Sequence, residues 1–557
     1  MTRVLGLDGS HEWVNHSSAL PVLSIHGRRS PEALQVSGGV AGAASGDVAP
    51  ADPEPDGGGE FGSAPELALQ SASDPALWTN IHFAAPALNH PRRVRRLQTI
   101  ALAMAASPGL SLPQLFPQWY DLKAAYHLFD HPEATPDAFQ VSHRQQTRHA
   151  LGQPGEYLLI EDTSVVSYSG RLPIEGLGAV GHSSEGQTGF ALHSVLAVRW
   201  PDAAPALEAT ERRPALEVVG LLDQQYDIRT PHPPAIDPRT GKTRRRPLKK
   251  VLSPEDWGVW ERATDRVGPA PRNAAVRWVR VADREADIYE YLCGCLEQGH
   301  GFLVRASQDR AVVSTATEDA ACYVFGAVSS LPMLGQLHLE IPARAGKARR
   351  VAALTITAGT MALKGPRRLG ARTKWPKELT VTVVRAFEAA PPAGVERLEW
   401  VLYHDRGVRT LSEAVDCVRK YASRWIIEEY HKALKTGMGA ERLQLESASR
   451  LSAAVAVMSV VAVRLLSLKE WARIAAEAPA SAAGLSELEL AVLREATGRG
   501  VVTVGEVALA VGHLGGHLNR KSDGLPGWQT LWRGMTKLGL LVAGVRLARR
   551  MDPPEPG

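Results

Sequence analysis

Three acidic residues have types and positions that suit metal-ion chemistry. Asp162 follows the apolar run YLLIE, and Asp283 follows the alternating run VRWVRVA. Because sites in α/β sheets form at the carboxyl ends of strands, two such aspartates on neighbouring strands would make a carboxylate pair. Mg²⁺ prefers oxygen ligands of this kind. Taken singly, a strand-end aspartate is more often a turn or helix-cap residue, so both interpretations stay open for the pair.

The third acid lies in the segment YASRWIIEEYHKALKTGMGAERLQLE. Its polar residues have the spacing Y-x-x-R-x-x-x-E-x-x-x-x-x-x-K, which on a continuous helix of about 100° per residue places them in one stripe roughly 60° wide. They are Tyr421, Arg424, Glu428 and Lys435. Glu428 would complete a metal shell, while Arg424 and Lys435 would hold phosphate oxygens. A solvated helix face with an Arg424–Glu428 pair is the alternative.

Carboxylates on two strands and a helix, with cations around them, fit two-metal phosphoryl transfer. One ion lowers the pKa of the attacking water or 3′-hydroxyl, and the other stabilises the leaving oxygen. The sequence has no G-x-S-x-G and no G-x-x-x-x-G-K-[ST] motif, so neither a serine-nucleophile elbow nor a P-loop is expected.

The composition allows a DNA-binding enzyme without singling one out. The chain has 557 residues, enough for two to four domains, and 63 Lys and Arg against 59 Asp and Glu give a net charge of +4. Local basic clusters argue for an anionic partner more strongly than this sum, although each could be a solvated surface. The clusters are Arg92, Arg93, Arg95 and Arg96; Arg244, Arg245, Arg246, Lys249 and Lys250; and Lys364, Arg367, Arg368, Arg372, Lys374 and Lys377.

Cysteine usage and hydropathy favour a cytoplasmic protein. The four cysteines lack a complete zinc-binding pattern, so we expect reduced thiols. No secretory segment is recognised at the start of the chain. The longest apolar stretch, 453–466, contains Arg464 and is too short to span a bilayer, so we expect a buried helix.

The hydropathy pattern predicts an ordered series of regions. Residues 1–77 are rich in Gly, Ala, Pro and Ser and are expected to be a disordered extension. Helical spacing predicts a basic helical domain over 78–155. Alternating runs predict an α/β domain over 156–470 with a β-rich insertion at about 300–410. Helices follow over 471–549, and residues 550–557 form a disordered tail.

With these segments together, the sequence resembles the bacterial cut-and-paste transposases of the IS-four family, most of all the Tn-five type. The resemblance runs from about Trp78 to about Arg549. It is sharpest at LLIEDTSVVSY, HSVLAV, VADREADIYEYL, LEWVL, YASRWIIEEYHKALKTGMGAERLQ, VVAVRLLSLKE and LGGHLNRKSDGLPGWQTLW. The complete Y-R-E-K signature behind IED and DREAD makes a chance match very improbable.

The resemblance implies an α/β fold with an RNase H-like catalytic core, a helical domain that binds transposon ends, and a C-terminal helical dimerisation domain. It assigns Asp162, Asp283 and Glu428 as the DDE ligands of two Mg²⁺ ions, which Mn²⁺ could replace. DNA-contacting positions would be Tyr421, Arg424, Lys435, Trp400, Arg305, His431 and Lys432, with Arg92, Arg93, Arg95 and Arg96 in the end-binding domain. Trp400 would stack on a flipped base, although sequence alone favours a core role for it.

The implied partners are double-stranded DNA, as transposon ends and target, and a second copy of the chain. A nucleoid-associated cytoplasmic enzyme would nick one strand, form and open a hairpin, and join the freed 3′ ends to target DNA. Alternatives are an RNase H-like nuclease or junction resolvase that does not transpose, an inactive DNA-binding inhibitor, and a generic α/β metal hydrolase.

The chain departs from its close relative at several points. The N-terminal extension has no recognised counterpart, and the basic loop 239–250 is longer than expected. Phe190 and Ala191 stand where the relative has two tryptophans, which puts the details of base flipping in doubt.

Overall fold

The computed structural model describes residues 2–5, 11–14, 75–168, 173–180, 187–202, 214–228, 254–313, 322–341, 350–366, 374–520 and 523–551. The chain divides into two units, Met1–Ser63 and Ala64–Gly557. In the first unit, strands β1 (Thr2–Leu5) and β2 (His11–Val14) pair antiparallel. This hairpin lies within the range 1–77, for which the composition predicts disorder.

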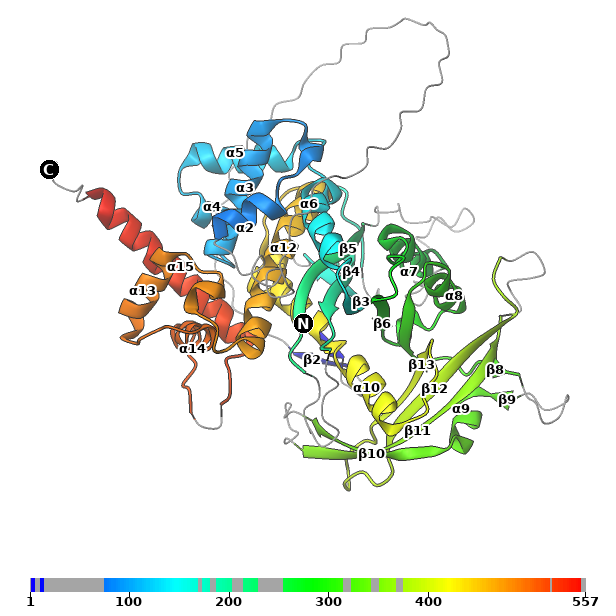
Figure 1. Ribbon diagram of the computed structural model, residues 1–557. Coiled ribbons are helices and arrows are strands. Elements are labelled where there is room, and N and C mark those ends of the chain that lie inside the picture. The colour runs from blue at the N-terminus through cyan, green and yellow to red at the C-terminus, as the bar shows by residue number, and fades with distance from the viewer. Residues whose placement is uncertain are drawn as a thin grey trace, which may run out of the picture. The chain divides into compact units, whose positions relative to one another are not determined.

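The second unit begins with a group of helices, drawn in blue and cyan in Figure 1. Pro91 occupies the first turn of α3, and the His90 side chain accepts a hydrogen bond from the Arg92 amide, so the helix begins with both a proline and a cap. The first helix begins at Pro75, three residues before the expected domain start at Trp78. The helices are α2 (Pro75–His82), α3 (Pro91–Ala106), α4 (Leu112–Leu115), α5 (Trp119–Phe129) and α6 (Pro136–Ala150).

One mixed sheet of eleven strands forms the centre of this unit. Its order is β5-β4-β3-β6-β7-β13-β12-β11-β8-β9, with β10 on β11. Strands β5, β4 and β3 run antiparallel, and β6 and β7 continue parallel to β3. The strands are β3 (Gly155–Ser167), β4 (Gly189–Arg199), β5 (Glu217–Asp227), β6 (Val276–Ala282), β7 (Gly301–Arg305), β8 (Ala311–Val312), β9 (Cys322–Tyr323), β10 (Met333–Ile341), β11 (Arg350–Lys364), β12 (Glu378–Glu388) and β13 (Glu399–His404).

The β-rich region expected at about 300–410 is therefore continuous with the central sheet. Its first strand, β7, is a parallel neighbour of β6, and β13 pairs with β7 antiparallel. Between β9 and β10 lies the short helix α9 (Val324–Ala327). The alternation that the sequence shows in this region is real, but periodicity does not reveal which strand it pairs with.

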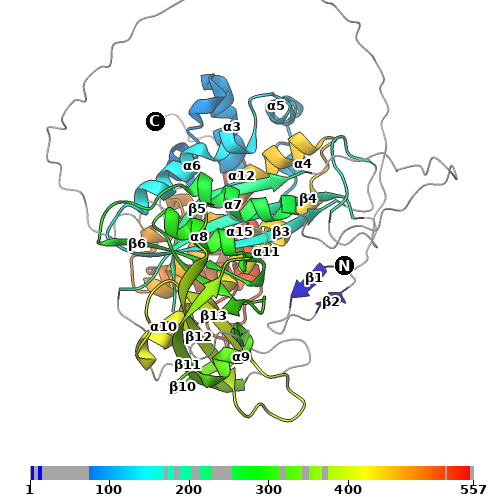
Figure 2. The same cartoon turned by 90° about the vertical axis from the view of Figure 1, so that its right-hand side faces the viewer.

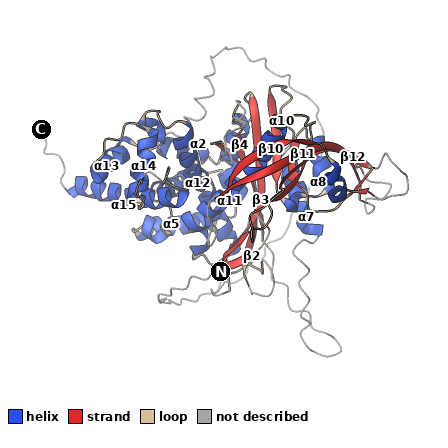
Figure 3. Cartoon of the chain, turned by 90° about the horizontal axis from the view of Figure 1, so that it is seen from below, coloured by secondary structure: helices blue, strands red, loops and turns tan. Residues whose placement is uncertain are grey.

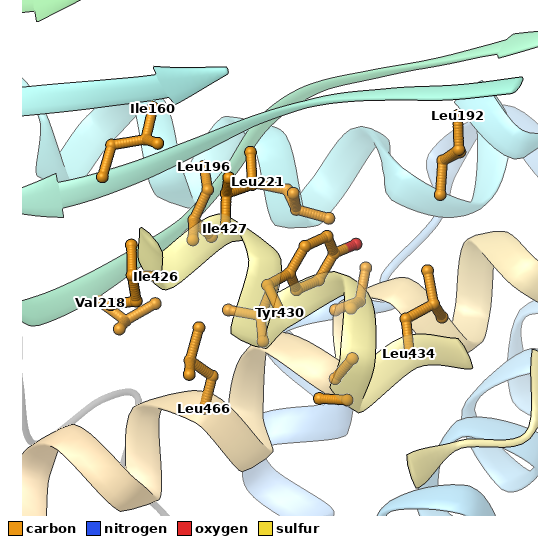
Figure 4. Close-up of a cluster of buried hydrophobic side chains, with 14 of the residues drawn as sticks. Ile160, Leu192, Leu196, Val218, Leu221, Ile426, Ile427, Tyr430, Leu434 and Leu466 are labelled. Atoms are coloured by element: carbon orange, nitrogen blue, oxygen red, sulfur yellow. The ribbon is translucent and has the colours of Figure 1, made fainter. Parts of the chain in front are cut away.

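Helices cover both faces of the central strands. In Figure 2, α7 (Pro254–Val267) and α8 (Tyr289–Glu297) lie in front of the strands, and α12 (Ala448–Ile474) lies behind them. Alternate residues of β3 divide between these layers: Leu158 and Ile160 join the core that includes α11 (Trp425–Lys432) and α12, whereas Leu159 packs with α7. Figure 4 shows Ile160 beside Ile426 and Ile427 in the first core.

Helix α12 joins the sheet to the C-terminal helices. It is long and apolar enough to cross a membrane, with a mean hydropathy of 2.1, yet 78% of that window is buried inside the protein. It packs against α6 and β5, which is the buried position expected for 453–466. Helices α13 (Glu487–Thr497), α14 (Val504–Leu514) and α15 (Trp528–Met551) share a core of their own and gather away from strands β10–β12 in Figure 3.

The predicted continuous helix from Tyr421 onward is wrong, because the segment is broken twice. Helix α10 (Leu411–Ala422) ends before α11 begins, and Ser423 caps its carboxyl end. A π-helix, η6 (Ala433–Gly437), follows α11, with the Met438 amide bonded to the Ala433 carbonyl at 2.7 Å. Each break changes the angle between successive side chains, so the 60° stripe does not describe this segment.

Candidate active site

The register of the sheet brings Asp162 and Asp283 to the same level on neighbouring strands. Ile160 of β3 lies opposite Val281 of β6, and each aspartate follows two residues later. Both continue the alternate positions that face α11 and α12. Asp283 also caps the 3-10 helix η3 (Arg284–Ala286), accepting a hydrogen bond from the Glu285 amide at 2.9 Å. Asp283 can therefore serve both as a helix cap and as a member of the candidate site.

Glu428 approaches this edge from α11, which contacts β3. Its carboxylate receives a hydrogen bond from the Arg424 guanidinium at 2.6 Å, in the i,i+4 geometry anticipated from the spacing. Both side chains are largely buried, with exposures of 17% and 14%. Arg424 itself lies between α10 and α11, so the break in the helix positions the cation beside the acid.

The electrostatics group the three acids around Arg424. Burial and the charge of Asp162 raise the pKa of Glu428 to about 7 despite Arg424. Burial likewise raises the pKa of Asp283, with Arg424 opposing and Asp162 adding to the rise. Burial would raise the pKa of Asp162 too, but His431 and Arg424 outweigh it and lower that pKa. These pKa effects indicate that the charge of Asp162 acts on the other two carboxylates and that a bound cation would stabilise their ionised forms.

Within the described ranges, no three His, Cys, Asp or Glu side chains lie close enough together to ligate one ion as they stand. The Arg424–Glu428 hydrogen bond accounts for part of this, because it directs one acid to an internal cation. The donor set still fits a hard divalent ion, since all three residues are carboxylates and two of them have raised pKa values.

Lys435 lies at the same edge, on the π-helix. Its Nζ is 3.5 Å from Ser164 Oγ on β3 and 3.6 Å from a carboxylate oxygen of Glu441. Ser164 follows Asp162 by two residues, so the ammonium lies on the same face of the strand, one alternate position beyond it. This is the place from which a cation can reach a phosphate held at the acids.

Tyr421, Trp400 and Arg305 form a group beside the acids, on the β7–β13 side. Tyr421 packs edge-to-face on Trp400, with ring centroids 5.3 Å apart. Burial lowers the pKa of Arg305, while Tyr421 and Asp283 oppose that shift. Arg305 also lines an open cavity of about 700 Å³ together with Arg284 and Arg385. Arg284 and Arg385, which line this cavity with Arg305, were not singled out by the sequence.

The structure does not present Trp400 to a DNA base. Its side chain is 1% exposed and belongs to the large core, as the sequence alone favoured. Phe190, where the relative has a tryptophan, is also fully buried and packs against Tyr168 and Tyr226. Base stacking by Trp400 would therefore require the ring to leave the core.

His431 and Lys432, for which the resemblance implies contact with DNA, both have partners within the protein. His431 is buried, with Nδ1 3.7 Å from Asp162 Oδ2 and Nε2 3.3 Å from Ser194 Oγ. The Lys432 ammonium lies 5.0 Å from the centre of the Trp425 ring. The contacts of His431 depend on the tertiary fold, whereas Lys432 and Trp425 lie two turns apart on the same helix.

The four arginines at the start of α3 divide into two pairs. Arg93 bonds to the Leu88 carbonyl at 3.0 Å and forms an ion pair with Glu133, and Arg96 pairs with Asp121 at 2.8 Å. Arg92 and Arg95 are exposed. Lys364, Lys374 and Lys377 of the third basic cluster are exposed as well. The cluster 244–250 and Arg367, Arg368 and Arg372 lie outside the described residues.

A second group of interacting polar side chains, which the sequence gave no reason to suspect, surrounds Glu161, the residue before Asp162. Glu161 points to the opposite face of β3, where Arg280, Tyr291 and His193 all bond to its carboxylate. Each of these partners comes from a different element, so no local spacing signals the cluster. The motif IED contained its acid, but only the pairing of β3, β4, β6 and α8 reveals its role.

Comparison with known protein families bears on the helices at the start of the second unit. The family model for transposase DNA-binding domains matches residues 75–134, which span α2 to α5. The exposed Arg92 and Arg95 lie inside the match. The chain therefore carries a transposase DNA-binding domain, followed by a large mixed sheet with helices on both faces, and the match supports a transposase that binds DNA.

Proposed function

We propose that the chain is a cut-and-paste DNA transposase of the IS-four type whose active site consists of Asp162, Asp283 and Glu428. The observation that carries the proposal is the level placement of Asp162 and Asp283 on neighbouring strands, with Arg424 acting on both of them and on Glu428, in a chain with a transposase DNA-binding domain. The parallel β3–β6–β7 strands, extended by antiparallel β4 and β5, support the expected RNase H-like core.

The three carboxylates would hold two Mg²⁺ ions, or Mn²⁺ in their place. When bound, the ions would supply an acidified water or 3′-hydroxyl and a stabilised leaving oxygen for in-line displacement at phosphorus. Arg424 now bonds to Glu428, and Glu428 must exchange this partner to serve as a ligand. Arg424, once released, and Lys435 can then hold oxygens of the phosphate that reacts.

The same site can carry out strand nicking, hairpin formation and opening, and strand transfer, because each step is a displacement at phosphorus. DNA ends would be held by the domain at 75–134, with Arg92 and Arg95 contacting phosphates. Two ends would pair in a homodimer assembled through the C-terminal helices. The enzyme would work on the bacterial chromosome in the cytoplasm.

The direct test replaces Asp162 by Asn and measures cleavage of DNA that carries the inverted repeats flanking the gene. In Mg²⁺ or Mn²⁺ the variant should lose several powers of ten in rate while binding the same DNA as well as the wild type. Near-normal cleavage by the variant would defeat the assignment.

A nuclease or resolvase that does not transpose is the second candidate, favoured by any result in which cutting occurs without joining. Wild-type protein incubated with cleaved ends and a supercoiled plasmid should give end-joined plasmid products. Cleavage with no joined product would favour the nuclease. Binding with no cleavage, under conditions where both metals are present, would favour the inactive inhibitor.

A further inference from the structure

A buried polar chain leads from α6 to the carboxylate of Asp162. His431 is only 5% exposed, and its two ring nitrogens face Asp162 and Ser194 rather than solvent. Ser194 lies on β4, directly opposite Asp162 in the antiparallel register. The imidazole therefore bridges two neighbouring strands from the helix that carries Glu428.

Gln224 follows Ser194 in this series of hydrogen bonds, and its own partners set the orientation of its side-chain amide. The Gln224 side-chain oxygen accepts hydrogen bonds from Gln140 at 2.8 Å and from the Tyr226 hydroxyl at 2.7 Å. Its amide nitrogen must then be the end that faces Ser194 and Tyr430, at 3.0 and 2.9 Å. In this orientation both ends of the Gln224 amide are satisfied, and a flip would lose the hydrogen bond from Gln140.

This orientation favours one tautomer of His431. With Gln224 donating to Ser194 Oγ, the hydroxyl hydrogen of Ser194 is free to donate to His431 Nε2, 3.3 Å away. A neutral imidazole whose Nε2 accepts carries its proton on Nδ1. That proton points toward Asp162 Oδ2, at an Nδ1–Oδ2 distance of 3.7 Å that a small movement of the carboxylate would shorten to a hydrogen bond.

We propose that His431 is a positioning residue that orients the Asp162 carboxylate, and that Gln140, Gln224 and Ser194 hold its ring in the donating tautomer. The inference rests on the metal-ligand role proposed for Asp162. With Oδ2 directed to His431, the other oxygen is presented to the ion. Partners of this kind fix ligand orientation in metal sites, and removing them typically lowers metal affinity by about 10–100-fold.

Gln140, at the end of the hydrogen-bonded series farthest from Asp162, connects the series to two helices. Gln140 lies on α6 and also donates to the Ala456 carbonyl of α12 at 3.1 Å. Five elements, α6, α12, β5, β4 and α11, thus contribute to the direction of one carboxylate. A rigid support of this kind is what a ligand on a strand edge needs to hold its geometry.

The test compares two substitutions of His431 in the full-length protein. His431→Asn puts an amide nitrogen near the position of Nδ1 and keeps a donor for Asp162, whereas His431→Gln reaches toward Ser194 and loses that donor. Mn²⁺ affinity is measured by titration of the free-ion electron paramagnetic resonance signal, with Asp162→Asn defining loss of the site. We expect His431→Gln to bind Mn²⁺ about 10–100-fold more weakly and His431→Asn to stay close to the wild type.

His300→Gln is the matched control. His300 is 1% exposed and bonds to the Gly268 carbonyl at 3.0 Å, far along the chain from the acids. Its substitution should lower the melting temperature and leave Mn²⁺ affinity unchanged. If His431→Gln does not fold, Ser194→Ala takes its place, since it removes the partner that fixes the tautomer and should weaken Mn²⁺ binding in the same direction.

The outcomes separate this inference from the function on which it rests. Equal Mn²⁺ affinity in wild type, His431→Asn and His431→Gln would overturn the positioning role, and so would equal losses in both variants, which would indicate a packing effect. A wild-type protein with no Mn²⁺ site sensitive to Asp162→Asn would instead remove the metal-ligand assignment itself.

Discussion

Glu161 and Asp162 are consecutive residues of β3 that meet opposite surroundings. Glu161 faces α7 and α8, is fully buried, and receives bonds from Arg280, Tyr291 and His193. Although burial would raise the pKa of Glu161, Arg280 and His193 lower it to about 2. Asp162 faces α11, where Arg424 is shared with Asp283 and Glu428.

The difference separates an acid that stabilises the fold from acids that remain available for chemistry. The protein itself satisfies Glu161, whose partners leave no need for an added ion. On the other face, the raised pKa values of Asp283 and Glu428 mark negative charge that the protein only partly offsets. A strand that turns alternate residues to alternate faces can hold both kinds of acid side by side.

The largest effect that this comparison predicts is on stability, from Glu161→Ala. Removing the acid leaves Arg280, which is fully buried, without its partner, and an unpaired buried charge costs about 3–5 kcal/mol. Urea unfolding should show this loss. Asp162→Asn is the matched change on the other face and should leave the unfolding free energy close to that of the wild type. Equal losses from both substitutions would erase the distinction between the two faces.

Local sequence patterns were enough to find the acids but not their surroundings. Apolar runs ending in Asp162 and Asp283 predict strand ends. The prediction is correct for Asp283, which directly follows β6, and wrong for Asp162, because β3 continues to Ser167. The Arg424–Glu428 pair follows from i,i+4 spacing, which survives because both residues are within one turn of the start of α11.

Longer-range features could not be predicted in this way. The extrapolation from Tyr421 to Lys435 failed because it assumed one regular helix across Ser423 and the π-helix at Ala433–Gly437. The contact of Glu161 with Arg280 depends on the pairing of β3 with β6, and that of Asp162 with His431 on the packing of α11 against β3; both join segments more than a hundred residues apart. Periodicity indicates which face of a helix or strand a residue lies on, but the tertiary fold determines which residues it contacts there.

Acid titration separates the contribution of Glu161 to stability from that of another buried group, His82. Burial and Arg464 lower the pKa of His82 from 6.5 to about 4, so the unfolded chain takes up a proton at a pH where the folded chain does not. Stability should fall by about 3 kcal/mol as the pH drops from 6.5 to 4. The contribution of Glu161, whose pKa falls from 4.5 to about 2, is present above pH 4.5 and is lost only below it.

Urea unfolding at pH 7, 5.5 and 4 would show whether stability is lost through His82 at a higher pH than through Glu161. His82→Asn removes one titrating ring and should reduce the loss between pH 6.5 and 4, to which His143 and His300 also contribute because burial lowers their pKa values. A profile that stays flat down to pH 4.5 in the wild type would contradict the account of His82.

The smallest effects are expected on the surface of the DNA-binding domain, where the same contrast between satisfied and available charges recurs. Arg92→Ala or Arg95→Ala should weaken DNA binding and reduce the slope of log affinity against log salt by about 1, because each removes one phosphate contact. Arg96→Ala breaks the ion pair with Asp121 and should cost up to about 1 kcal/mol of stability. Unchanged salt slopes in the Arg92 and Arg95 variants would argue against phosphate contact.

The convergence of three distant segments on one ion is tested most directly by cleavage of the chain itself. Fe²⁺ bound in place of Mg²⁺, with ascorbate and peroxide, generates radicals that cut the backbone near the ion, and mass spectrometry locates the cuts. The account predicts cuts close to Asp162, Asp283 and Glu428 together, suppressed by excess Mg²⁺ and absent in Asp162→Asn. Cuts that spare any of the three segments, or that persist in excess Mg²⁺, would contradict it.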